Sequence, residues 1–152
     1  AVSRWLATAG TTSWLSNIGD LEGISGAVEA IGQGRKEGEA SVEGIHVEGP
    51  FLYPKYLPGE STAPPAPAQL STYHEYLEAC QGHLVMMDCS PDLPGGLEII
   101  REIRRTGVIA CFAHGNADYD LFMRAVEAGL THVTHTYNVM SGMHHRRPGA
   151  NC

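Results

Sequence analysis

The chain has 152 residues, 43% of them hydrophobic and 18% charged, which suits one globular domain. Its net charge of −7 argues against nucleic acid as a partner. No apolar run reaches the about 18 residues of a membrane span, and the four cysteines form no C-x-x-C pair, so we expect a reduced, cytoplasmic protein. The N-terminus lacks a signal-peptide pattern, and we expect both ends to continue in a longer protein.

Helix-like and strand-like segments alternate from the first third of the chain onward. Apolar residues at helical spacing predict a helix over 19–33, a polar loop follows over 34–43, and residues 44–48 form a short apolar strand. Residues 49–70 are rich in proline, which excludes regular structure over most of them. A long loop directly after a strand is usually functional.

The second half repeats the same alternation more regularly. Thr72 and Glu75 have the spacing of a capping box, which predicts a helix that begins at Thr72 and stops at Gly82. Further strands are predicted over 83–89, 107–113 and 131–137, and further helices over 95–106 and 118–128.

This order of elements favours an α/β fold with a parallel sheet, covering helices and right-handed crossovers. Polar residues recur where the predicted strands end, which is typical of a (β/α)8 TIM-type barrel. A complete barrel needs roughly 200 residues or more, so we expect a partial barrel with about five strands over residues 1–152. A doubly wound sheet is the alternative architecture.

Glu48, His114 and His135 each close a short apolar run, at the exits of what would be three successive strands. Two neutral imidazoles and a carboxylate, with one position open for water, form a ligand set of hydrolytic zinc. The same set suits Fe²⁺, Co²⁺ or Mn²⁺. Taken singly, Glu48 could be a solvated strand-end residue, and each His a packed one. The equivalent placement of all three favours a metal site.

Two further features bear on chemistry. His46 lies two residues before Glu48 and shares its strand face, whereas His132 is expected to be a packed residue. Arg146 lies in the one dense basic cluster, His144–Arg147, and its guanidinium suits phosphate. A solvated surface arginine is the alternative for Arg146.

Four motifs in this order resemble those of the N-acetylglucosamine-6-phosphate deacetylase family, in the amidohydrolase superfamily. They are His46–Phe51 (HVEGPF), Ala113–Ala117 (AHGNA), Thr134–Met140 (THTYNVM) and Arg146–Gly149 (RRPG). The resemblance spans about Gly10 to Gly149 and includes the intervening helices. It implies a cytoplasmic homodimer that hydrolyses the acetamide of N-acetylglucosamine 6-phosphate to glucosamine 6-phosphate and acetate in amino-sugar catabolism.

The resemblance also implies roles for individual residues. It places a divalent metal on Glu48, His114 and His135. It places substrate contacts on Asn138, Val139 and, across the dimer interface, Arg146.

Several features depart from the family pattern. Val139 replaces the usual Ala, and Leu57–Ser61 lacks the histidine that contacts the sugar. The family's general acid/base Asp would lie beyond residue 152, so we expect no catalytic residue within this chain. The opening barrel strand and a small β-domain would precede residue 1. An amidohydrolase for another acylated amino sugar, or a non-catalytic barrel fragment, are the alternatives.

Overall fold

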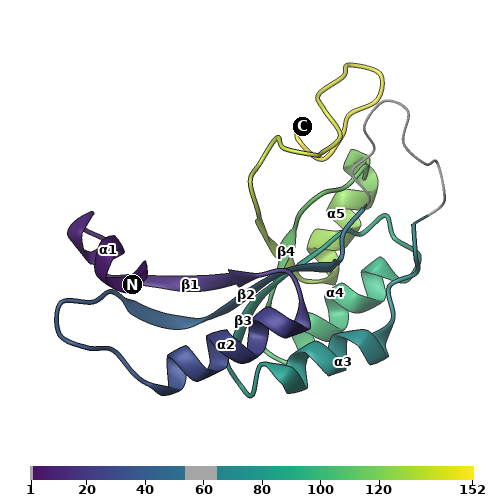
Figure 1. Ribbon diagram of the computed structural model, residues 1–152. Helices are drawn as coiled ribbons and strands as arrows, with labels where there is room; N and C mark the ends of the chain where they lie inside the picture. Colours follow the sequence, from purple (N-terminus) through teal and green to yellow (C-terminus); the bar gives the residue numbers. More distant parts are fainter. Residues whose placement is uncertain (1, 54–64) are drawn as a thin grey trace, which may run out of the picture.

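The computed structural model describes residues 2–53 and 65–152, and the structural statements below concern this part of the chain. Five strands form one fully parallel sheet in the order β1-β2-β3-β4-β5 (Figure 1). The elements are α1 (Val2–Thr8), β1 (Ser13–Ile18), α2 (Leu21–Gly32), β2 (Ser41–Phe51), α3 (Leu70–Ala79), β3 (Leu84–Cys89), α4 (Gly96–Arg105), β4 (Ile109–Phe112), α5 (Tyr119–Ala128) and β5 (Leu130–Val133).

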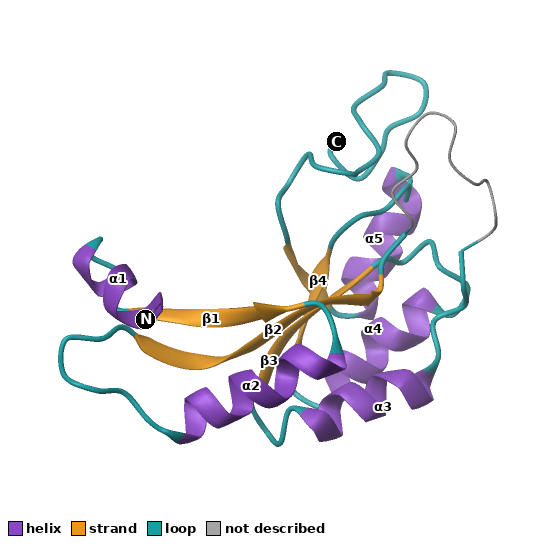
Figure 2. Ribbon diagram, in the orientation of Figure 1, coloured by secondary structure: helices purple, strands orange, loops and turns teal. Residues whose placement is uncertain are grey.

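Helices α2 to α5 lie on one side of this sheet, and α1 stands apart beside the start of β1 (Figure 2). A doubly wound sheet would reverse its strand order and carry helices on both faces. Here the strands follow one another in sequence order, as in a (β/α)8 barrel. The prediction of a partial barrel is confirmed, and the doubly wound alternative is wrong.

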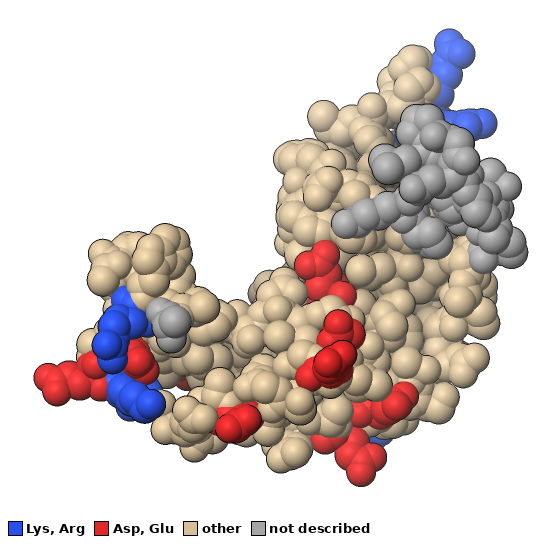
Figure 3. Space-filling view, viewed as in Figure 1, with Lys and Arg blue, Asp and Glu red and all other residues tan. Residues whose placement is uncertain are grey.

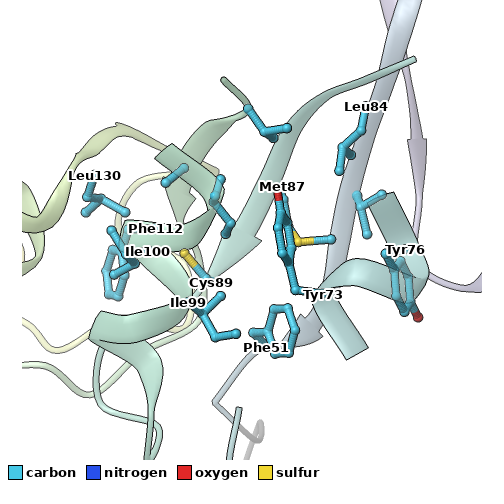
Figure 4. Packing of buried hydrophobic residues seen from close by; sticks show 14 of the residues in the cluster. Phe51, Tyr73, Tyr76, Leu84, Met87, Cys89, Ile99, Ile100, Phe112 and Leu130 are labelled. Atoms are coloured by element: carbon cyan, nitrogen blue, oxygen red, sulfur yellow. The ribbon is translucent and has the colours of Figure 1, made fainter. Parts of the chain in front are cut away.

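The core lies between the sheet and these helices. Alternate strand residues, such as Met87 and Phe112, pack against Tyr73 of α3 and Ile99 and Ile100 of α4 (Figure 4). Because successive strand side chains point to opposite faces, burying one set toward the helices turns the other toward the open side of the sheet. That second set carries the polar residues discussed below.

Most of the strands differ in length from the prediction, and β2 and β5 differ in ways that affect the site. Strand β2 continues through Gly49-Pro50 to Phe51, whereas the sequence pattern ended it at residue 48. The extension is held by pairing with β3, where the Ser90 amide donates to the Phe51 carbonyl at 2.8 Å. Strand β5 ends at Val133, four residues earlier than predicted, because the chain turns into left-handed conformations at His135 (φ 34°) and Tyr137 (φ 73°).

Helix α3 also begins earlier than predicted. Its N-cap is Gln69, which makes no side-chain capping bond, and the Tyr73 amide already donates to the Gln69 carbonyl at 3.2 Å. Thr72 is therefore inside the first turn, and the predicted capping box is wrong. Elements α1 and β1 had no counterpart in the sequence-based prediction, since their short segments show little periodicity.

All four cysteines are free thiols, and Cys80, Cys89 and Cys111 are buried. Among the described residues, no helix is long and apolar enough to cross a membrane.

Candidate metal centre

Glu48, His114 and His135 converge on one point. The Glu48 Oε1 atom lies 3.6 Å from His114 Nε2 and 3.7 Å from His135 Nε2. The two imidazole rings stack with their centroids 4.8 Å apart and an interplanar angle of 29°. One ligand atom from each residue lies within 4.8 Å of the other two, so a single cation could contact all three.

Each side chain lies near the carboxyl end of a parallel strand. Glu48 lies within β2, and its Oε2 atom accepts a hydrogen bond from the Asn17 amide of β1 at 3.4 Å. His114 and His135 follow β4 and β5 in left-handed turns, with φ of 42° and 34°. A non-glycine residue in this region costs free energy and persists where the surroundings fix it.

Backbone hydrogen bonds hold the turn at His114. Its carbonyl accepts from the Tyr53 amide at 3.1 Å, just beyond the end of β2. On the other side, the Gly115 amide donates to the Val139 carbonyl at 2.9 Å. The turn is thereby tied to the segment after β2 and to the segment after β5. Strand β2 carries Glu48, and the segment after β5 carries His135.

The sequence pattern suggested that the three residues close successive strands, but the structure shows that they do not. Strand β3 lies between β2 and β4 and supplies none of the three ligands. Its carboxylate, Asp88, instead contacts His46, the residue two positions before Glu48. The candidate ligands therefore reach toward one another across the end of β3.

Burial and hydrogen bonding fit a divalent metal. His114 is 3% exposed, whereas the side chains of Glu48 and His135 are 30% and 28% exposed, so the cluster is open on one side. Both ring nitrogens of His135 are buried and have no hydrogen-bond partner within residues 2–53 and 65–152. Buried imidazole nitrogens need a proton partner or a metal, and this donor set is the one expected of hydrolytic zinc.

A second polar group lies deeper in the same sheet. Asp88 is fully buried, and its Oδ1 atom lies 2.9 Å from His46 Nε2 and accepts a bond from Thr134 Oγ1 at 2.6 Å. The pKa of the neighbouring Cys111 thiol is raised from 9.0 to about 12, first by burial and then by the negative charge of Asp88, against a hydrogen bond with Thr134 that lowers it. Sequence reasoning missed Asp88, because a single carboxylate inside an apolar strand gives no spacing signal.

The remaining predicted site residues lie farther along the chain. Asn138 is exposed in the segment after β5, and Val139 is half-buried with a left-handed φ of 52°. Arg146 is exposed and lines a pocket with Asn116 and Asp118 that includes none of the three candidate ligands. Leu57–Ser61 lie outside the described residues.

The charge distribution also sets the Arg146 region apart. On the face drawn in Figure 3, acidic side chains lie along the helix side and at the end near α1, and most of the visible basic side chains lie at the two ends. One basic end is the tip of the C-terminal segment, whose cationic residues are Arg146 and Arg147. A basic tip on a chain of net charge −7 is a local attraction for an anionic group.

Comparison with known proteins finds relatives that align with nearly the whole chain. N-acetylglucosamine-6-phosphate deacetylase of Bacillus subtilis is 32% identical over 97% of this chain and 39% of its own length. A structure of an N-acetyl-D-glucosamine-6-phosphate deacetylase mutant from Mycobacterium smegmatis, in complex with N-acetyl-D-glucosamine-6-phosphate, superposes with a TM-score of 0.80 at 26% identity, over 98% of this chain and 39% of that one. The chain matches a part of the N-acetylglucosamine-6-phosphate deacetylase family.

A relative with a different sugar in its name also matches. N-acetylgalactosamine-6-phosphate deacetylase of Escherichia coli O157:H7 is 29% identical over 94% of this chain and 39% of its own length. The chain thus spans about two fifths of the curated relatives it matches. No protein-family model matches the chain.

Proposed function

We propose that this chain is the central part of a metal-dependent barrel hydrolase. The enzyme would remove the acetyl group of N-acetylglucosamine 6-phosphate, giving glucosamine 6-phosphate and acetate in cytoplasmic amino-sugar catabolism. Glu48, His114 and His135 would hold the divalent metal. Asn138, Val139 and Arg146 would hold the substrate. In a homodimer, Arg146 would reach across the interface to the phosphate of the substrate bound by the partner subunit.

The observation that carries this proposal is the convergence of the three candidate ligands. They lie far apart in sequence, yet their donor atoms come within 4.8 Å of one another. Relatives that share the sequence over most of this chain are deacetylases of phosphorylated amino sugars. Family membership and the geometry of the site therefore support the same chemistry.

The residues would divide the work as follows. The Asn17 amide holds Glu48 Oε2, which leaves Oε1 directed at the two imidazoles. Buried His114 closes the site toward the core, and half-buried His135 leaves the opposite side open to substrate. A divalent metal bound there would polarise the acetamide carbonyl and make a nucleophile of water near neutral pH.

Metal analysis of two matched variants tests the site. Glu48→Gln removes a proposed ligand, whereas Glu43→Gln removes an exposed carboxylate from the same strand. After stripping with a chelator and reloading with Zn²⁺, Glu48→Gln should bind one equivalent less than Glu43→Gln. Loss of a hydrogen-bond partner of a metal ligand typically lowers metal affinity about 10- to 100-fold. Loss of the ligand itself in Glu48→Gln should lower the zinc affinity of this site by at least as much. Equal metal content in both variants would contradict the assignment.

The second candidate substrate is N-acetylgalactosamine 6-phosphate. The Escherichia coli relative named for that sugar covers this chain almost as fully as the glucosamine relatives do. The two sugars differ only in the configuration at C4, so a comparison of kcat/KM in the longer enzyme decides between them. Activity on neither sugar, with metal bound, would favour another acylated amino sugar or a non-catalytic barrel.

A further inference from the structure

A second cluster of potential ligands lies beneath the proposed metal centre. His46 of β2, Asp88 of β3 and Cys111 of β4 each offer one donor atom, and these atoms lie within 4.8 Å of one another. Asp88 and Cys111 are fully buried, and the His46 side chain is 14% exposed. The cluster combines nitrogen, oxygen and sulfur donors from three neighbouring strands.

The residues of this cluster come earlier along their strands than those of the first cluster, so the two clusters lie at different depths in the sheet. His46 precedes Glu48 by two residues on β2, which corresponds to about 7 Å along a strand. Cys111 pairs with Asp88 across β3 and β4, and it precedes His114 by three residues. The two clusters share strands and an inward direction, but they share no residue.

The hydrogen bonding of Asp88 indicates that this cluster could bind a cation. Its Oδ1 atom already accepts hydrogen bonds from Thr134 Oγ1 and lies 2.9 Å from His46 Nε2. Its Oδ2 atom is buried and has no hydrogen-bond partner among the described residues. No Lys or Arg of this part of the chain forms an ion pair with Asp88. An unpaired buried carboxylate oxygen costs several kcal/mol unless a cation or donor faces it.

We propose that His46, Asp88 and Cys111 form a second cation site, distinct from that of Glu48, His114 and His135. A mixed nitrogen, oxygen and sulfur donor set suits Zn²⁺ best among the common divalent metals. Zinc ligand atoms lie about 2.0–2.3 Å from the ion, so the three side chains draw closer together when it binds. Binding satisfies Asp88 Oδ2 and ties β2, β3 and β4 together below the first metal. The site stands whether or not the chain belongs to a deacetylase.

Cobalt spectroscopy separates the two sites, because only the second contains sulfur. Titration of the purified, metal-free chain with Co²⁺ should produce a near-ultraviolet thiolate-to-cobalt charge-transfer band. Glu48→Gln should keep this band although it damages the first site. Cys111→Ser should abolish the band and lower the number of bound cobalt ions by one. Cys152→Ser, which removes the exposed thiol, is the matched control and should keep the band.

A further variant guards against misfolding of Cys111→Ser. His46→Gln alters the more accessible ligand and should weaken the cobalt affinity that the band reports by about 100-fold, with unchanged circular dichroism. The proposal is overturned if the wild-type chain shows no band at two equivalents of cobalt. It is also overturned if the band disappears in Cys152→Ser, or persists unchanged in a folded Cys111→Ser or His46→Gln.

Discussion

Glu48 directs one carboxylate oxygen toward Asn17 and the other toward His114 and His135. This division leaves a single oxygen as the candidate metal ligand. His135 contributes ring nitrogens that have no other partner in the described part of the chain. At the scale of single residues, the site therefore has donor atoms directed at one point, which is what metal binding requires.

Arg146 gives a test of substrate recognition. In the longer enzyme to which this chain is proposed to belong, Arg146→Ala should raise KM for the phosphorylated sugar about ten- to a hundredfold. It should change KM for the unphosphorylated sugar little, because the guanidinium would pair with phosphate. Steady-state kinetics with both sugars measure the difference.

Arg147→Ala is the control, since Arg147 is also exposed and lines the same pocket. It should have the smaller effect on the phosphorylated sugar. Equal effects of Arg146→Ala on both sugars would show that Arg146 is a solvated loop residue.

Cys80 gives a pH dependence of stability. Burial raises the pKa of its thiol from 9.0 to about 11. The unfolded thiol therefore loses its proton first as the pH rises, so the stabilisation is complete below about pH 9 and is lost toward pH 11. The free energy of unfolding should fall by at most about 1 kcal/mol per pH unit from this group.

Urea unfolding of the wild-type chain and Cys80→Ala between these pH values isolates that contribution. Other buried groups titrate in both proteins and cancel in the comparison. The difference in unfolding free energy between the two should shrink as the pH rises. A constant difference would show that Cys80 does not titrate with the folded state.

Strand β2 is the element that organises the site. It pairs with β1 and β3, carries His46 and Glu48 on one face, and continues to Phe51. The segment after β5 performs a similar role from the other side, since Val139 and Ser141 form backbone hydrogen bonds with Gly115. The turn at His114 is thus clamped between two elements that are far apart in sequence.

Gly115, next to His114, is packed too tightly for a larger side chain. A Cβ atom there would lie 2.7 Å from Ser90 Oγ and from a ring carbon of Phe112. Gly115→Ala should therefore destabilise the chain by about 1–3 kcal/mol and displace His114, which lowers metal affinity.

Gly142→Ala is the matched control, because a Cβ atom at Gly142 would meet nothing within 4 Å. It should change stability by no more than about 0.5 kcal/mol. Chemical denaturation and zinc titration of both variants measure the two effects. Similar losses in both would mean that the turn at Gly115 is not tightly packed.

At the scale of the whole molecule, the described sheet is open. Strands β1 and β5 each have one unpaired edge, and helices cover a single side (Figures 1 and 2). Unpaired edges invite association with further strands, and a complete barrel removes them. The open sheet, and the share of its relatives that the chain covers, support the proposal that it works as part of a larger barrel.

The 152-residue chain alone should not deacetylate N-acetylglucosamine 6-phosphate at ordinary enzyme rates. The resemblance implies a general acid/base Asp beyond residue 152, and such groups typically supply 10²–10⁴-fold in rate. Acetate release from a zinc-loaded sample, compared with the longer enzyme at equal metal content, checks this. Equal turnover by both would show that the chain holds its own proton-transfer group.

The α/β alternation, most helix positions and the three candidate ligands could be predicted from the sequence, because hydrophobic periodicity and polar strand ends are local signals. The extension of β2 to Phe51 and the contact of Asp88 with His46 became evident only from the three-dimensional structure. These features depend on pairing and side-chain contacts between segments far apart in the chain. The sequence pattern of a strand predicts to which face of the sheet each side chain points, but not which side chain of another strand it will contact.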